Sequence, residues 1–504
     1  MTRHFLSLLI ALLLPLAANG QQRHRGIGCW RTISAQQKAG ARLQRARQAS
    51  DGTTDTPYQG QKKGLVILAE FPDKKFKNGH DKDKYHDILN TEGYTTAEGF
   101  HGSAADYFRD QSGGLFELTF DVLGPYTTAH DYKYYGKNDD DGYDLRPEEM
   151  IIEMCMAADA EADFTDYDWD GDGEVDEVFV VFAGKGEADN LQSELIWPHM
   201  WTMDEAKKEL ALDGVKINVY ACANELSATS KINGIGTFCH EFSHCLGFPD
   251  FYDTANTSCE GMDGFDLMDS GCYAGGGFCP VGFSAYEKMA CGWRWPIVLS
   301  SDDVSIDSLA PMNQGGDSYI IYNDAHPDEY YIIENRQKTG WDKYFPSEGL
   351  FICHVDYDEQ IWTDNIPNAI VNKQRALELN ITATNDHERM TFFNASDKSY
   401  SKQLYPYLQN DSLTATSKPT ATLYNHNSQN TLRMQGALLN ITQNDGGTVS
   451  FRYHASLPPT ADAIGSIIMP QRQQAATIYN LQGQKVTTKQ KGIYIVNGQK
   501  VAVK

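Results

Sequence analysis

The 504-residue sequence is poor in positive charge, in cysteine and in long apolar segments. Lys and Arg number 43 against 68 Asp and Glu, and the formal net charge of −25 argues against nucleic acids and anionic membranes as partners, because both would repel the protein. Ten cysteines are too few at this length for a disulfide scaffold. What is present, 41% hydrophobic and 22% charged residues, indicates a globular protein of two or three domains.

One apolar run stands out, at residues 5–18, and no second one of this kind follows it. It comes after Arg3 and gives way to small residues before Gly20, in the order of a secretory signal peptide. The run is too short to span a bilayer comfortably. We therefore expect residues 1–20 to be cleaved off and the protein to be secreted or held at the cell surface, with no integral membrane segment.

Three further segments follow the signal. Residues 21–63 are rich in Gln, Arg and Ala with little apolar face, which predicts a basic pro-segment or linker. From the apolar, β-rich run 64–73 up to residue 296, predicted helices and strands alternate, which indicates an α/β catalytic domain over 64–296. Residues 297–457 predict an all-β, sandwich-like accessory domain. Its short strands are predicted at 319–322, 329–335 and 349–355.

The C-terminal residues 458–504 predict a short tail of β-hairpins. The tail resembles the C-terminal sorting signals of proteins that Bacteroidetes export through the outer membrane, although it is shorter than a full sorting domain. That resemblance implies outer-membrane secretion machinery as a partner. The alternative is that these hairpins form the edge of the preceding β domain.

The sequence HEFSHCLGFPD at residues 240–250 indicates a catalytic zinc site. Residues four apart share one face of a helix, so His240 and His244 can bind one metal ion, with Glu241 beside its open coordination position. From there Glu241 can take a proton from zinc-bound water. Gly247 permits a sharp turn that brings Asp250 back as the third ligand, in the pattern H-E-x-x-H-x-x-G-x-x-H with Asp in place of the last His.

Residues that flank this motif leave some roles open. Asp253 and Glu287 are alternative third ligands, because both are near in sequence. Met268 lies in a Gly-flanked segment that resembles the Met-turn beneath the metal of metzincins, whereas for Met268 alone simple core filling is the alternative. Tyr273 is a candidate for stabilising the oxyanion, and its alternative role is that of a packed loop aromatic. The motif's helix is predicted to start near Ile235.

An acidic loop at residues 168–176 follows the first nine positions of an EF-hand calcium loop. Oxygen donors alternate and Gly173 takes the place of the glycine at the bend, but position twelve is Phe179, so the bidentate glutamate is missing. A solvated acidic turn is the alternative. The predicted calcium ligands are Asp168, Asp170, Asp172, Glu174 and Asp176.

Cysteines gather around the zinc motif, six of them between Cys239 and Cys291. This clustering predicts disulfides that brace the loops of the active site, with Cys272 and Cys279 as the local pair, and buried free thiols as the alternative. Cys29 lies in the basic segment, where its thiolate could hold the fourth zinc position as a latency switch. A disulfide at Cys29 is the competing interpretation.

The chain resembles the immune inhibitor A family of secreted bacterial zinc metallopeptidases over about residues 64–453. The resemblance implies a metzincin-like domain with catalytic zinc, calcium support, an N-terminal pro-segment and protein substrates. The region before Gly64 is short for a full inhibitory prodomain, which puts the latency mechanism in question. The segments that carry the resemblance are 66–73, 106–107, 178–184, 196–199, the zinc motif, 280–293, 334–337 and 349–356.

We therefore expect a zinc endopeptidase in which His240, His244 and Asp250 hold the metal. Zinc polarises the scissile carbonyl, and Glu241 takes the proton of the water and returns it to the leaving amine. Two other classes of protein remain open: a zinc hydrolase acting on an ester or a glycan-linked amide, and a calcium-stabilised surface adhesin.

Overall fold

The computed structural model describes residues 58–140, 142–396 and 398–455, together with the backbone of residues 478–480, 492–496 and 499–503. The predicted signal peptide, most of the basic segment with Cys29, and most of the C-terminal tail lie outside the described residues. Within the described part, no helix is both long and apolar enough to cross a membrane.

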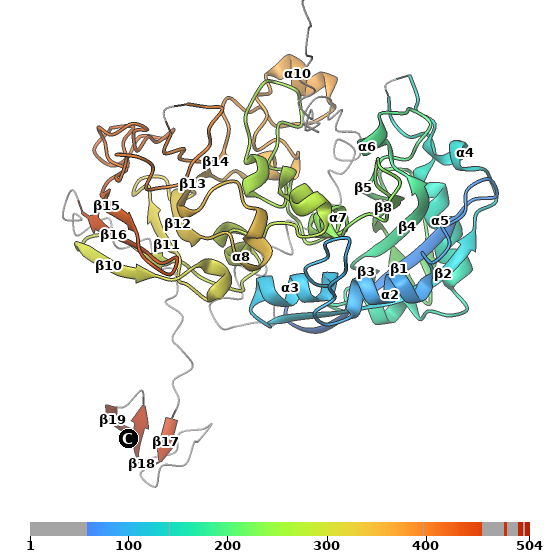
Figure 1. The fold of residues 1–504 in the computed structure, drawn as a ribbon, viewed down its shortest axis with the longest axis horizontal. Coiled ribbons are helices and arrows are strands. Elements are labelled where there is room, and N and C mark those ends of the chain that lie inside the picture. Colours follow the sequence, from blue (N-terminus) through green and yellow to red (C-terminus); the bar gives the residue numbers. More distant parts are fainter. Residues whose placement is uncertain are drawn as a thin grey trace, which may run out of the picture.

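A five-stranded sheet organises the N-terminal half of the chain (Figure 1). Its order is β2-β1-β4-β8-β5, with parallel neighbours except for β5, which is antiparallel at one edge. The strands are β1 (Gly60–Glu70), β2 (Phe116–Thr127), β4 (Val178–Lys185), β5 (His199–Thr202) and β8 (Val219–Leu226).

Both faces of this sheet are covered, as the continuous apolar run in β1 requires. Val66 and Leu68 point into one core, whereas Leu65 and Ile67 point into the other. The first core is closed by α2 (Lys82–Asn90), α3 (Ala104–Ser112) and α7 (Gly236–Cys245). The second is closed by α4 (Tyr132–Gly136), α5 (Pro147–Ala158) and the 3₁₀ turn η2 (Phe164–Tyr167). This is the predicted α/β architecture.

Short elements fill the connections of the N-terminal half. A small three-stranded sheet has the order β3-β7-β6. The elements are β3 (Glu174–Val175), α6 (Glu187–Asn190), β6 (Ala211–Leu212), β7 (Val215–Ile217), η3 (Asp263–Phe265), η4 (Ser270–Gly277) and α8 (Ala285–Ala290).

Two more sheets make up the C-terminal half, with orders β14-β13-β12-β11-β9 and β10-β16-β15. The helical segments here are η5 (Met312–Gln314), η6 (Gly340–Tyr344), α9 (Glu359–Thr363) and α10 (Lys373–Glu378). The strands are β9 (Ile297–Val298), β10 (Val304–Leu309), β11 (Tyr319–Tyr322), β12 (Glu329–Arg336), β13 (Gly349–Asp356), β14 (Met390–Phe392), β15 (Ala437–Gln443) and β16 (Val449–His454).

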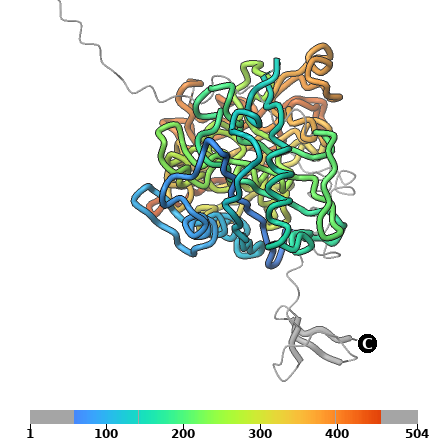
Figure 2. The backbone as a smooth tube through the Cα atoms, turned by 90° about the vertical axis from the view of Figure 1, so that its right-hand side faces the viewer, coloured from blue at the N-terminus to red at the C-terminus, as the bar shows by residue number. Residues whose placement is uncertain are grey.

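The predicted all-β accessory domain is not confirmed, because this half contains α9 and α10 and does not pack as a separate sandwich. Every residue of β12 and β13 is buried. One face of their sheet shares a core with β10, β15 and β16, but the opposite face, with Ile332 and Phe351, joins the core of α7. In Figure 2, turned by 90°, the N-terminal half faces the viewer and the C-terminal half lies behind it.

Three strands are described in the tail: β17 (Ile478–Asn480), β18 (Gly492–Val496) and β19 (Gln499–Val503). They pair antiparallel in the order β17-β18-β19. The predicted sorting role of this tail stays a prediction.

Candidate zinc site

Helix α7 places the two histidines of the motif. It begins directly after Ile235, and a Cβ on Gly236 would lie 1.8 Å from the carbonyl oxygen of Cys272, so glycine lets η4 approach the start of the helix. Phe238 and Phe242 pack against Phe120 on the sheet, at centroid distances of 5.3 and 5.7 Å. That anchoring leaves the other side of α7 to the motif's polar side chains.

Three potential ligand atoms converge at the end of α7. Oδ1 of Asp250 lies 3.2 Å from Nε2 of His240 and 3.3 Å from Nε2 of His244. Ligands held about 2.0–2.1 Å from a tetrahedral zinc ion are themselves about 3.3 Å apart, so both distances fit such an ion. All three residues lie within a group whose ligand atoms are within 4.8 Å of one another.

Backbone carbonyl groups fix the orientation of both imidazoles. Nδ1 of His240 lies 2.8 Å from the oxygen of Leu267, and Nδ1 of His244 lies 2.7 Å from the oxygen of Phe248. Because a carbonyl oxygen only accepts, each Nδ1 carries the proton, and in the neutral ring the lone pair of Nε2 faces Asp250. The residue after Leu267 is Met268, which is fully buried, so the predicted Met-turn directly follows the residue whose carbonyl orients His240.

Asp250 is a buried carboxylate between these rings. Burial alone would raise its pKa, but the neighbouring His244 and His240 hold the pKa of Asp250 well below the usual value. Its backbone N–H donates to Oδ1 of Asn365 at 2.6 Å, and its Oδ2 accepts from Nδ2 of Asn365 at 2.8 Å. Sequence reasoning missed Asn365, because no local spacing links residues 115 positions apart.

The two alternative third ligands are engaged elsewhere. The Asp253 carboxylate accepts the backbone N–H groups of Ala255 and Cys259, both at 3.1 Å, in a tight turn. Glu287 accepts the backbone N–H of Ser284 and caps the start of α8. The geometry therefore favours Asp250.

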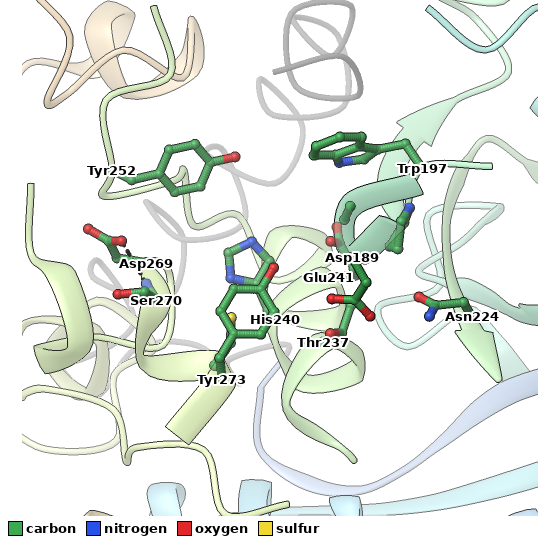
Figure 3. A pocket seen from close by; sticks show the side chains of 13 residues that line it. Asp189, Trp197, Asn224, Thr237, His240, Glu241, Tyr252, Asp269, Ser270 and Tyr273 are labelled. Atoms are coloured by element: carbon green, nitrogen blue, oxygen red, sulfur yellow. Dashed lines mark hydrogen bonds between the residues drawn. The ribbon is translucent and has the colours of Figure 1, made fainter. Parts of the chain in front are cut away.

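A cavity opens beside the candidate ligands and is lined by Glu241 and His240 (Figure 3). Glu241 is 7% exposed. Burial raises its pKa above the usual value, partly offset by His240 and His244 and by a hydrogen bond from the backbone N–H of Met200. A raised pKa suits a carboxylate that must accept and then release a proton near neutral pH.

Tyr273 lies in η4 and also lines this cavity, with 41% of its surface exposed. Figure 3 shows its ring in front of His240, with Tyr252 across the cavity. Its position at the cavity wall is compatible with the predicted contact to an oxyanion.

The predicted disulfide between Cys272 and Cys279 is wrong for this structure, where both residues are separate thiols. Cys272 lines the same cavity as His240. Cys279 points elsewhere, with its Sγ 3.5 Å from the oxygen of Trp341. Closeness in sequence misled the prediction, because the glycines at 275–277 turn the chain between the two side chains.

The acidic loop at residues 168–176 brings together three of its five predicted calcium ligands. Oxygens of Asp168, Asp170 and Asp176 lie within 4.8 Å of one another. Asp172 and Glu174 lie outside this group. The Asp168 carboxylate accepts the N–H groups of Gly171 and Gly173, at 2.8 and 2.9 Å, which folds the loop around it.

Comparison with known proteins finds similarity to peptidases in the first half of the chain. Residues 53–295 match the family described as immune inhibitor A peptidase M6, catalytic domain. The pre-pro-metalloprotease PrtV of Vibrio cholerae serotype O1 is 27% identical over 300 residues, 50% of this chain and 32% of PrtV. Immune inhibitor A of Bacillus thuringiensis subsp. alesti is 28% identical over 287 residues, 48% of this chain and 41% of that protein. The chain thus spans well under half the length of these curated relatives.

Proposed function

Because residues 53–295 match the family described as immune inhibitor A peptidase M6, catalytic domain, we propose that the protein is a zinc-dependent endopeptidase acting on protein substrates. The observation that carries the proposal is the convergence of His240, His244 and Asp250 beside Glu241 at an open cavity. Two neutral imidazoles and one carboxylate are a ligand set typical of catalytic zinc, which keeps one coordination position open.

Zinc held by His240, His244 and Asp250 would act as a Lewis acid, which polarises the scissile carbonyl and lowers the pKa of a water molecule. Glu241 takes a proton from the attacking water and returns it to the leaving amine. His240 and His244 are oriented to bind the metal through Nε2, because backbone carbonyls hold their Nδ1 atoms. Tyr273, at the cavity wall, donates its hydroxyl hydrogen to the oxygen that becomes negative.

Substitution of Glu241 by Gln tests this mechanism. Glu241→Gln should retain bound zinc and the melting temperature but lose peptidase activity by about a hundredfold or more, because general-base catalysis commonly contributes 10² to 10⁴. Glu209→Gln, at an exposed position, is the matched control and should leave all three quantities unchanged. Near-normal cleavage of casein by the zinc-loaded Glu241 variant would remove Glu241 from the mechanism.

We also propose that the loop at Asp168, Asp170 and Asp176 binds structural calcium, supported by the three grouped carboxylates and by the EF-hand-like spacing. We propose as well that the protein is exported through its N-terminal signal. Sequencing the N-terminus of secreted protein tests this export, and a mature protein that still begins at Met1 would contradict it.

A further inference from the structure

Asn365 contacts the candidate third ligand from outside the family-matched segment. It lies between α9 and α10, beyond the end of the match at residue 295. The side-chain amide accepts the backbone N–H of Asp250 at 2.6 Å and donates to Oδ2 of Asp250 at 2.8 Å. With Oδ2 held in this way, Oδ1 is the oxygen that faces His240 and His244.

The backbone of Asn365 is held in place as well. Asn365 is fully buried and has a φ of 56°, a left-handed conformation that Asn tolerates better than most residues. The backbone carbonyl oxygen of Asn365 accepts from Oγ1 of Thr254 at 2.7 Å, and the backbone N–H of Asn365 donates to the carbonyl oxygen of Trp362 at 3.2 Å. The preceding Asp364 ties the same loop to the backbone N–H of Ala383 at 2.7 Å.

A carboxamide supplies both halves of this contact through separate atoms: its oxygen accepts from an N–H and its nitrogen donates to a carboxylate, without adding charge. Without the amide, the buried backbone N–H and Oδ2 of Asp250 would lose this partner. Oδ1 could then rotate away from the imidazoles. Groups that orient a ligating carboxylate commonly contribute 10- to 100-fold to metal affinity.

We propose that Asn365 is a positioning residue for the metal site: it fixes Asp250 in the rotamer that binds zinc, so residues beyond 295 complete a site whose ligands all lie before it. The inference rests on the proposed function only in taking the bound metal to be zinc. It makes the C-terminal half an integral part of the peptidase, consistent with the core that α7 shares with β12 and β13.

The test compares Asn365→Gly with Asn380→Gly in the full chain. Glycine adopts positive φ without strain, so Asn365→Gly removes the side chain and its amide without straining the backbone. Asn380 has a φ of 54° and an exposed side chain, which makes it a matched control. Zinc affinity, measured by competition with a chromophoric chelator, should fall about 10- to 100-fold in Asn365→Gly and stay unchanged in Asn380→Gly.

Melting of the metal-free proteins separates positioning from simple destabilisation. A lower melting temperature of metal-free Asn365→Gly with wild-type zinc affinity would overturn the inference. If that variant does not fold, Thr254→Val removes only the hydrogen bond that fixes Asn365 and should weaken zinc binding several-fold; unchanged affinity would again overturn the inference. Wild-type protein that binds no zinc, or that keeps it after His244→Ala, would instead refute the proposed function.

Discussion

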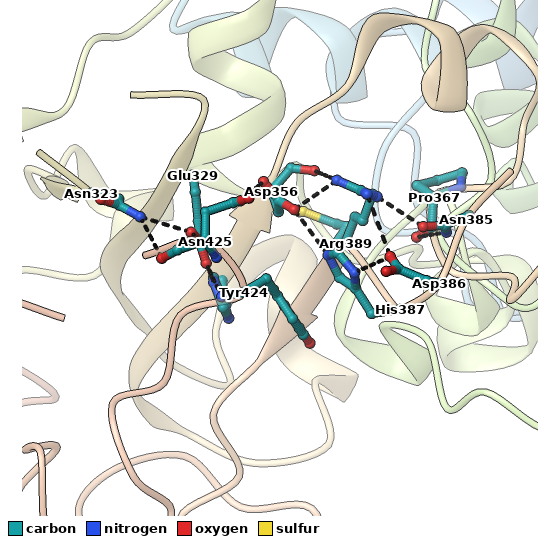
Figure 4. Close-up of polar contacts among 12 residues, drawn as sticks. Asn323, Glu329, Asp356, Pro367, Asn385, Asp386, His387, Arg389, Tyr424 and Asn425 are labelled. Atoms are coloured by element: carbon teal, nitrogen blue, oxygen red, sulfur yellow. Dashed lines mark hydrogen bonds and ion pairs between the residues drawn. The ribbon is translucent and has the colours of Figure 1, made fainter. Parts of the chain in front are cut away.

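Replacing Glu329 by Gln should destabilise the protein strongly at neutral pH and much less in acid. Glu329 begins β12, is fully buried and receives hydrogen bonds on both oxygens (Figure 4). Oε1 lies 2.9 Å from Nε2 of His354 and accepts the N–H of Tyr424 at 2.6 Å. Oε2 accepts Nδ2 of Asn323 at 2.9 Å and the N–H of Asn425 at 3.0 Å.

The size of the effect follows from the pKa of this carboxyl group. Burial would raise the pKa of Glu329, but the hydrogen bonds from His354, Tyr424 and Asn323 outweigh it and lower the pKa to about 2 from the usual 4.5. Such a depression is equivalent to at most about 3 kcal/mol of unfolding free energy at neutral pH. Because the folded pKa is the lower one, this stability is complete above pH 4.5 and is lost as the pH falls through 2.

Urea unfolding, followed by tryptophan fluorescence from pH 7 to pH 3, measures the free energy of unfolding of the wild type and the variant. The cost of Glu329→Gln should be about 3 kcal/mol at pH 7 and about 1.4 kcal/mol at pH 3, where the folded carboxylate is largely ionised but its unfolded counterpart is not. Glu348→Gln, at an exposed position, should cost little at either pH. A cost that is independent of pH would refute the reasoning, because it would trace the effect to packing rather than to charge.

Two further predictions concern the acidic loop at residues 168–176 and Cys29 in the basic N-terminal segment. Adding calcium to metal-free protein should raise the melting temperature, with about 2.7 kcal/mol of stabilisation at a hundredfold excess over Kd. Asp170→Ala should abolish most of that rise. A wild-type melting temperature that does not respond to calcium would refute the calcium site. If Cys29 is a latency switch, unprocessed Cys29→Ser should cleave peptides without activation, measured on the purified precursor; an inactive unprocessed variant would leave the disulfide interpretation.

Local patterns predicted the elements of the fold well. Helix α7 starts after the predicted Ile235, and the strand expected at 319–322 is β11 (Tyr319–Tyr322). The strand expected from residue 64 is β1 (Gly60–Glu70), which extends four residues further toward the N-terminus. These elements were predictable because apolar periodicity and helix spacing are properties of neighbouring residues.

The packing of β12 was not predictable in the same way. Its sequence EYYIIENR carries charged residues near both ends, a pattern that suggests solvent exposure, yet all eight residues are buried. Arg336 is neutralised by Asp342 at 2.6 Å and by Glu334 at 3.5 Å, and its guanidinium also donates to the carbonyl oxygen of Gly282 at 2.7 Å. Burial of charge requires such partners, and no pattern within β12 reveals that they are present.

Arg336 of β12 also interacts electrostatically with Asp266, close in sequence to Leu267 at the candidate zinc site. Burial raises the pKa of Asp266 well above its usual value, with a further rise from nearby Glu287. Asp266 in turn accepts the N–H of Met268 at 2.8 Å, next to Leu267, whose carbonyl orients His240. Through this hydrogen bond, Asp266 holds the backbone next to the carbonyl that orients His240. The motif thus predicted which side chains could hold the metal, whereas what orients them depends on contacts that form only when the two halves of the chain pack together.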